Sequence, residues 1–243
     1  MQPIRVVVAG ATGKVGREVV RGVHQQADMK LVGAVALDHV GEDIGRLFLN
    51  QEVGVTVSPE LETLLQGIKP DVLVDFTAPS VAGRHIRTAL ERGVHPVVGT
   101  TGIPPADLEE FREFCRTRRF GAAIIPNFSV GAMLLQRFSR EAVKFLPDVE
   151  IVELHHHQKL DAPSGTAARL ARSMSREREI PIHSVRLPGL VAHHEVIFGG
   201  PGQTLVLRHD SMNRESFVPG VLMTIRKVTG LQGLVEDLED IIG

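Results

Sequence analysis

The segment from His155 to Thr166 holds an unusual density of side chains that can handle protons. It reads His-His-His-Gln-Lys-Leu-Asp-Ala-Pro-Ser-Gly-Thr, with three imidazoles, an amine and a carboxylate. Histidine gains or loses a proton near neutral pH, so these groups are suited to general acid–base chemistry. A hydrophobic core has no use for this polarity, and we therefore expect an active site here.

A helix start within the same segment adds a candidate anion site. The run Pro163-Ser164-Gly165-Thr166 predicts Ser164 as an N-cap. The backbone N–H groups of Gly165 and Thr166 would then be available to a carboxylate. Lys159 adds a mobile positive charge nearby in the chain. The segment therefore predicts an anionic substrate held beside proton donors.

The three histidines have two other possible uses, metal binding and simple solvation. Adjacent side chains on an extended segment point alternately, so His155, His156 and His157 do not converge on one ion, and the chain has no H-E-x-x-H pattern. A polar strand edge with solvated histidines is the second alternative. We expect acid–base chemistry and no metal site, and the role of His157 stays open.

A glycine-rich turn near the N-terminus predicts a source of hydride. Gly10-Ala11-Thr12-Gly13-Lys14-Val15-Gly16 follows the apolar run 4–9 and precedes a helical pattern over 14–25. Glycines permit a tight turn and close approach to a pyrophosphate, and the helix N-terminus offers N–H groups. The spacing is G-x-x-G-x-x-G, which also suits a turn without a ligand. We expect Gly10, Ala11, Thr12, Gly13, Lys14 and Val15 to bind a dinucleotide.

The choice between NADH and NADPH depends on Asp38. This residue follows the second strand pattern, 31–36, where an acidic side chain would bind the adenosine ribose. Its charge would repel a 2′-phosphate, whereas Lys14 and His39 would offset that repulsion. Alternatively, Asp38 is an ordinary turn residue that binds no ribose. The expected cofactor is therefore NADH or NADPH.

Three later strand patterns end in side chains that could surround a nicotinamide. Ligands bind at the carboxyl edge of open α/β sheets, where the strand order reverses. Each of these residues taken alone could be an ordinary loop residue without a ligand. Because the strand ends share one edge of the sheet, a binding site is the better interpretation. The residues are Phe76, Thr77, Gly99, Thr100, Thr101, Asn127 and Phe128.

The order of these elements predicts two domains. Repeated strand–helix units up to Asn127 predict an α/β, Rossmann-type doubly wound parallel sheet. Beyond it, strand patterns without intervening helices predict a smaller α+β domain with a mixed or antiparallel sheet. We expect residues 1–127, with 214–243 returning to them, to bind the dinucleotide, and residues 128–213 to bind the substrate. The later patterns are helices at 132–145 and 166–179 and strands at 149–154, 185–187, 194–198 and 204–208.

Composition narrows the possible functions. The net charge is −2, and the chain has ten Phe but no Trp or Tyr, which argues against nucleic-acid binding. It has no secretion signal and no apolar run of the ~20 residues that a membrane helix needs, so a soluble cytoplasmic protein is expected. The single cysteine, Cys115, excludes an internal disulfide and is expected to be buried.

The histidine segment closely resembles a known family signature. Residues 153–167 resemble the E-x-H-H-x-x-K-x-D-A-P-S-G-T-A signature of the 4-hydroxy-tetrahydrodipicolinate reductases, also called dihydrodipicolinate reductases, of diaminopimelate and lysine biosynthesis. That resemblance implies reduction of a small cyclic dicarboxylate by NADH or NADPH, and a homotetramer built through the C-terminal sheet. It extends over essentially the whole chain, through residues 10–16, 75–77, 98–102, 127–131, 184–189 and 208–210.

The resemblance also implies roles for individual residues. His155 would be the proton donor or acceptor and Lys159 a second donor. The substrate would contact His156, Lys159, Gly165 and Thr166, and the nicotinamide would contact Gly99, Thr100, Thr101, Ile125, Pro126, Asn127 and Phe128. The segment 35–39 departs from the family's usual acidic position, which leaves the cofactor preference open. Two rival functions are a nucleotide sensor without turnover and a dehydrogenase of another dicarboxylate, such as aspartate.

Overall fold

The chain divides into two compact units. The computed structural model describes residues 2–175 and 178–243. Unit 1 comprises Met1–Phe128 together with Phe217–Gly243, and unit 2 comprises Ser129–Ser216. Unit 2 is therefore inserted into unit 1, with the chain leaving at Phe128 and returning at Phe217. The functional division of labour between the two units stays a prediction.

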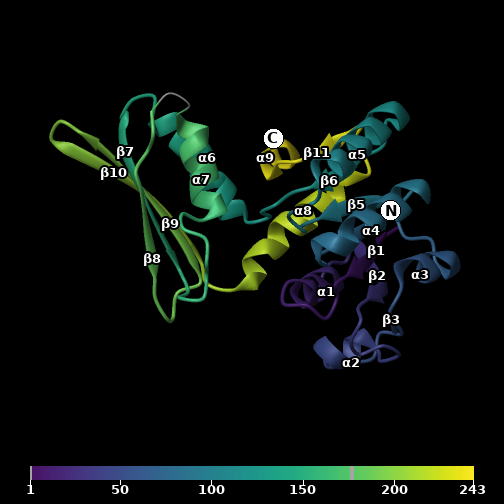
Figure 1. The fold of residues 1–243 in the computed structure, drawn as a ribbon. Coiled ribbons are helices and arrows are strands. Elements are labelled where there is room, and N and C mark those ends of the chain that lie inside the picture. The colour runs from purple at the N-terminus through teal and green to yellow at the C-terminus, as the bar shows by residue number, and fades with distance from the viewer. Residues whose placement is uncertain (1, 176–177) are drawn as a thin grey trace. The chain divides into compact units, whose positions relative to one another are not determined.

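Unit 1 is built on a seven-stranded sheet with the order β11-β6-β5-β4-β1-β2-β3 (Figure 1). All its strand pairs are parallel. The order reverses between β1 and β4, which is where a doubly wound sheet binds its ligand. The strands are β1 (Ile4–Ala9), β2 (Met29–Val35), β3 (Val57–Ser58), β4 (Val72–Asp75), β5 (His95–Val98), β6 (Ala122–Ile124) and β11 (Leu234–Val235).

Helices cover both faces of this sheet, which explains why its strands are apolar on both sides. On one face, Leu61 of α3, Ala89 of α4 and Phe111 of α5 are buried against it. On the other face lie α1 and α8, which also contact each other. This arrangement confirms the predicted Rossmann-type fold. The helices are α1 (Gly16–His24), α2 (Ile44–Phe48), α3 (Leu61–Gly67), α4 (Pro79–Glu91), α5 (Pro105–Arg118), α8 (Val218–Val228) and α9 (Leu238–Ile242), and a 3₁₀ turn, η1 (Arg214–Phe217), precedes α8.

Unit 2 is a four-stranded sheet with the order β10-β9-β7-β8. The β7–β8 pair is parallel and the other two pairs are antiparallel, so the predicted mixed sheet is confirmed. Helices α6 and α7 pack on one face, around Leu135, Ile151, Leu170 and Phe198. The elements are α6 (Val130–Ala142), β7 (Asp148–His155), α7 (Gly165–Met174), β8 (Ile182–Arg186), β9 (Ala192–Gly200) and β10 (Gln203–Ser211).

Some predicted element bounds were wrong. The helix expected over 166–179 ends at Met174, and residues 176 and 177 of that expectation lie outside the described residues. The helix expected to reach Phe145 ends at Ala142. The C-terminal stretch, expected to be helical, also contains β11, which pairs with β6. A two-residue strand is specified by its distant partner and carries no local pattern of its own.

The structure gives the environment of the single cysteine and the length and polarity of the helices. Cys115 is fully buried, as expected, and this burial raises the pKa of its thiol to about 11. A thiol in this environment is a structural residue. Among the helices of the described residues, none is long and apolar enough to cross a membrane.

Candidate functional site

The turn between β1 and α1 depends on two of its glycines. Gly10 has a φ of +74°, and a Cβ there would lie 2.6 Å from the carbonyl oxygen of Phe76. A Cβ on Gly16 would lie 1.9 Å from the carbonyl oxygen of Gly10. Within the described chain, no side chain caps α1 at Val15, so its first N–H groups are not satisfied in that way. This geometry suits the binding of a phosphate group.

The carboxyl ends of β4, β5 and β6 meet at one place. The ring of Phe76 covers Gly99, where a Cβ would approach the ring to 2.0 Å. The same ring packs on Phe128, with 5.9 Å between centroids and a tilt of 59°. Three strand ends that the sequence predicted to share an edge are therefore in direct contact.

A buried carboxylate fixes two of these loops. Asp75, at the end of β4, is fully buried. Its Oδ1 accepts hydrogen bonds from the Thr77 N–H (2.9 Å), the Thr77 hydroxyl (2.7 Å) and the Thr100 hydroxyl (3.1 Å). Its Oδ2 lies 2.7 Å from Nδ1 of His85 on α4. The sequence did not single out His85, because nothing local pairs it with a residue ten positions earlier.

Asp38 is joined to the glycine turn. Its Oδ1 accepts a hydrogen bond of 2.5 Å from the Thr12 hydroxyl. That bond lowers the pKa of the exposed Asp38 carboxyl, which is therefore ionised at neutral pH. His39, the neighbour expected to offset this charge, lies with its Nδ1 3.0 Å from Oε1 of Glu42.

In unit 2, β7 ends at a buried histidine paired with a buried carboxylate. His155 is 7% exposed and Glu153 is fully buried, and Nδ1 of His155 is hydrogen-bonded to Oε2 of Glu153. Because an ionised carboxylate only accepts, Nδ1 carries the proton, which leaves Nε2 for proton exchange. Burial lowers the pKa of His155, and the hydrogen bond to Glu153 opposes that effect.

Glu153 also connects β7 to β8 and to the segment before α7. Its Oε1 accepts a hydrogen bond of 2.6 Å from Nη2 of Arg186 and one of 3.3 Å from the Ser164 N–H. The same Arg186 nitrogen donates to the carbonyl of Asp161 at 2.7 Å. Burial disfavours ionisation of Glu153, but hydrogen bonds from Arg186, Ser184 and His155 outweigh it and lower the pKa.

The start of α7 has the predicted cap. The hydroxyl of Ser164 accepts a hydrogen bond of 3.2 Å from the Ala167 N–H, which confirms Ser164 as the N-cap. Nε2 of His194 lies 3.3 Å from the same hydroxyl. The His194 ring meets His155 edge to face, with 5.3 Å between centroids, and burial lowers the pKa of His194 to about 4.

The remaining expected residues lie in the turn after β7. Only His155 belongs to the strand; His156 is half-buried, His157 is exposed, and the chain turns as the Lys159 N–H donates to the His156 carbonyl at 3.1 Å. The prediction of three histidines on one extended segment was therefore wrong beyond His155. The ammonium of Lys159 lies 2.7 Å from Oδ1 of Asp161.

Three contributors to this site were not identified as functional residues from the residue pattern. Glu153 is one of them, and its signal is local: it lies two positions before His155 on a strand, so the two side chains share a face. Arg186 and His194 come from β8 and β9, and only the strand pairing brings them to β7.

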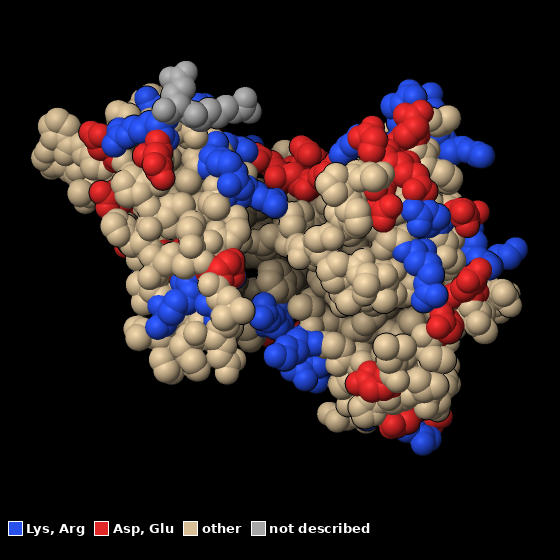
Figure 2. Space-filling model, viewed as in Figure 1, with Lys and Arg blue, Asp and Glu red and all other residues tan. Residues whose placement is uncertain are grey.

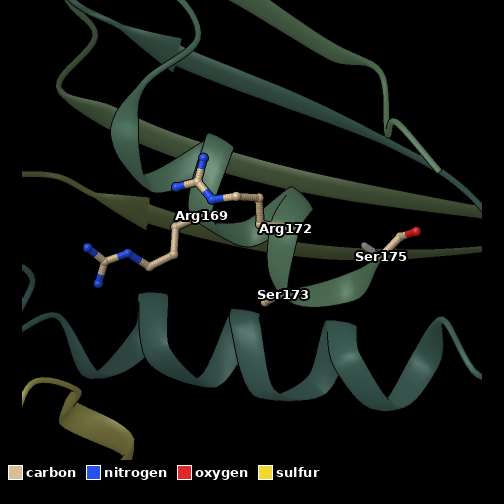
Figure 3. Close-up of a pocket in the computed structure, with 4 residues that line it drawn as sticks. All are labelled: Arg169, Arg172, Ser173 and Ser175. Carbon is tan, nitrogen blue, oxygen red and sulfur yellow. The ribbon is translucent and has the colours of Figure 1, made fainter. Parts of the chain in front are cut away.

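Other surface features of unit 2 lie apart from these residues. A cavity of about 540 Å³ is lined by Arg169, Arg172, Ser173 and Ser175, at the middle and C-terminal end of α7 (Figure 3). The expected anion-binding N–H groups are at the opposite end of that helix.

On the visible face of unit 1, basic and acidic side chains are intermixed (Figure 2).

Comparisons with known proteins agree over the whole chain. Residues 4–128 match the family model described as dihydrodipicolinate reductase, N-terminus, and residues 131–242 match the corresponding C-terminus model. A 4-hydroxy-tetrahydrodipicolinate reductase of Symbiobacterium thermophilum is 51% identical, over 99% of this chain and 98% of its own length. One from Moorella thermoacetica is 45% identical, over 98% of each.

Solved structures give the same result. A dipicolinate-bound dihydrodipicolinate reductase from a Paenisporosarcina species superposes with a TM-score of 0.86 at 38% identity, covering 99% of this chain and 100% of its own. An amine dehydrogenase from Mycobacterium smegmatis has a TM-score of 0.71 at 15% identity, covering 97% and 95% of the two chains. The second likeness is one of fold alone.

Proposed function

The chain belongs to the dihydrodipicolinate reductase family, and from this premise we propose how its residues carry out the family's reaction. That reaction is the reduction of 4-hydroxy-tetrahydrodipicolinate to tetrahydrodipicolinate with NADH or NADPH, in lysine and diaminopimelate biosynthesis. The observation that carries the proposal is the pairing of buried His155 with buried Glu153, close in the chain to Lys159 and the α7 N-terminus.

Unit 1 is the proposed nucleotide site. The turn from Gly10 to Val15 would hold the pyrophosphate, because Gly10 and Gly16 allow a close backbone approach at the start of α1. Asp38 would accept hydrogen bonds from the adenosine ribose. The nicotinamide end would lie at the joined strand ends, whose proposed contacts are Phe76, Thr77, Gly99, Thr100, Thr101, Ile125, Pro126, Asn127 and Phe128. A bound reduced nicotinamide supplies the hydride for this reduction.

Unit 2 is the proposed substrate site. The substrate carries two carboxylates, and one would bind the N–H groups of Gly165 and Thr166 with the ammonium of Lys159 beside it. His156 would contribute a further contact. These are the groups whose charge and geometry fit a carboxylate, and the solved Paenisporosarcina relative is bound to dipicolinate, itself a dicarboxylate.

His155 is the proposed proton donor. With Nδ1 held by Glu153, its Nε2 is the nitrogen that exchanges a proton with the substrate, and the Glu153 charge stabilises the protonated ring. Lys159 is the second donor, able to release a proton as charge builds on the substrate ring. Burial around His155 excludes water that would otherwise compete for the proton.

The assembly we propose is a cytoplasmic homotetramer. Helices α6 and α7 cover one face of the unit 2 sheet. The other face presents half-buried or exposed apolar side chains, which support pairing with further copies of the chain: Val152, Leu154, Val185, Ile197 and Val206. Sedimentation at micromolar concentration tests this, and a monomeric chain would contradict it.

A turnover assay tests the proposed function. Freshly generated 4-hydroxy-tetrahydrodipicolinate is added with NADH and NADPH in parallel, and nucleotide oxidation is followed. Consumption of nucleotide only when this substrate is present supports the proposal. Nucleotide binding without turnover would indicate a sensor. Turnover only with another dicarboxylate, such as an aspartate-derived one, would indicate a related dehydrogenase.

A further inference from the structure

We propose that the carboxylate of Asp161 occupies the substrate-carboxylate subsite in the ligand-free protein, and that the substrate must displace it. Asp161 then sets the intrinsic affinity that a ligand needs to occupy the site. This inference rests on the proposed function, because it takes Lys159 and the α7 N-terminus as the groups that receive the substrate.

The ammonium expected to hold the substrate already has an internal carboxylate as its partner. Oδ1 of Asp161 is 2.7 Å from the ammonium of Lys159. The hydrogen bond from Lys159 lowers the pKa of Asp161. One side chain therefore already pairs with the positive charge of the predicted anion site.

The backbone of Asp161 is anchored, whereas its side chain is free to leave. Its carbonyl accepts a hydrogen bond of 2.7 Å from Arg186, which is held by buried Glu153. Its side chain is 57% exposed, against 24% for Lys159. Rotation of the carboxylate into water costs little, because an exposed ion pair contributes little stability. The internal carboxylate can therefore yield to a ligand without unfolding the loop.

Such a competitor raises the intrinsic affinity that an anion needs to occupy the site. Any incoming carboxylate must first break the Lys159–Asp161 pair, which lowers the apparent affinity of every ligand by the same factor, the fraction of open sites. A monoanion only replaces one carboxylate by another. A dicarboxylate gains contacts for its second carboxylate, and these offset the displacement. Small anions are thereby excluded from Lys159 while the substrate is admitted.

The test is a binding measurement on Asp161→Asn. Pyridine-2,6-dicarboxylate is titrated by calorimetry into the NADH-loaded protein, since the chain has no Trp or Tyr to report binding by fluorescence. We expect roughly two- to fivefold tighter binding than in the unmodified chain, the gain from not breaking a partly exposed ion pair. Acetate should gain by the same factor, because each ligand displaces the same carboxylate, so acetate should bind Asp161→Asn at concentrations that leave the unmodified chain empty.

Asp148→Asn is the matched control. It also removes one carboxylate from unit 2, but from the far end of β7, where Asp148 pairs with Arg178. The affinity of Asp148→Asn for pyridine-2,6-dicarboxylate should equal that of the unmodified chain. This result would separate a local effect of Asp161 from the general effect of removing one negative charge. Asp161→Glu, with its longer carboxylate, should restore part of the displacement cost and weaken binding again.

Unchanged or weaker binding in Asp161→Asn would overturn the inference. Weaker binding together with a lower kcat would instead make Asp161 a positioning residue for Lys159. The turnover assay on the unmodified chain separates this failure from that of the proposed function. An inactive unmodified chain refutes both, whereas an active one with no tighter binding in the variant refutes only the role of Asp161.

Discussion

Asp75 and His85 form a buried hydrogen bond of 2.7 Å that joins the end of β4 to α4. The other oxygen of Asp75 holds the loops of Thr77 and Thr100, so one carboxylate sets the position of both proposed nicotinamide loops. Buried networks of this kind are costly to break, because each lost partner leaves another group unsatisfied.

Asp75→Asn should therefore affect both stability and nucleotide binding. We expect a loss of about 2 kcal/mol in the free energy of unfolding and a rise of roughly three- to tenfold in the KM for NADH or NADPH. Denaturant titration and steady-state kinetics measure the two effects. Asp71→Asn is the control, since Asp71 is exposed and precedes β4 at its opposite end. A nucleotide KM that does not move would remove the positioning role.

Glu153→Gln should shift the pH dependence of turnover. The Glu153 charge stabilises protonated His155, so its removal lowers the pKa of His155 further. A proton donor is lost as the pH rises through its pKa, and the basic limb of kcat/KM should therefore move to lower pH. Kinetics across about pH 5–9 measure this shift around the histidine range. Glu150→Gln, on the same strand but exposed beside His183, should keep the original profile.

Lys159→Ala should lower turnover at least tenfold, roughly the contribution of one positioned proton donor or charge, while nucleotide affinity stays nearly unchanged. Lys159 belongs to unit 2, whereas the proposed nucleotide contacts belong to unit 1. Turnover kinetics and NADH titration test the two statements separately. Lys144→Ala removes an exposed lysine paired with Glu141 and serves as the control. Near-normal kinetics in Lys159→Ala would remove this residue from the mechanism.

Asp38→Ala should weaken NADH binding more than NADPH binding. The ionised Asp38 carboxylate is placed by Thr12 beside the glycine turn, where it would accept from the ribose hydroxyls of NADH and repel a 2′-phosphate. The ratio of the two dissociation constants should shift by roughly tenfold toward NADPH. Equal changes for both nucleotides would count against the ribose assignment, and Glu42→Ala controls for the loss of a nearby charge.

Acid should destabilise the folded chain through its buried histidines. Burial lowers the pKa of His194 to about 4, so below the ordinary histidine value the unfolded chain binds a proton that the folded chain does not. Stability therefore falls as the pH drops, by about 2 kcal/mol between pH 7 and pH 5 from this residue. Denaturant titrations at several pH values measure the slope. His194→Gln should flatten it, and replacement of exposed His157 by Gln should not.

The sequence predicted the fold where the signal was local and repetitive. The β1 run, the glycine turn and the strand–helix alternation identify the doubly wound sheet, because the period of the apolar residues determines each element. The Ser164 cap was also predictable from its neighbours. β11 was not, since its two residues form a strand only through β6.

The residues of the candidate site also differ in whether a local sequence pattern predicts them. His155, Lys159 and the start of α7 lie close together in sequence, and the motif predicts them as site residues. Arg186 and His194 reach the site across strands β8 and β9, and His85 reaches Asp75 from the middle of a helix. Those contacts depend on how strands pair and how helices pack on them, and a single sequence does not specify that pairing directly.

The insertion of unit 2 within unit 1 has a consequence for the order of synthesis. Helix α8 packs in the layer with α1, and β11 completes the edge beside β6, yet both come after residue 217. During translation, unit 2 leaves the ribosome complete while unit 1 still lacks one covering helix and an edge strand. A nascent chain halted at Ser216 would therefore leave the α8 side of β5 and β6 uncovered, so unit 1, the proposed nucleotide site, is the last part of the chain to complete its fold.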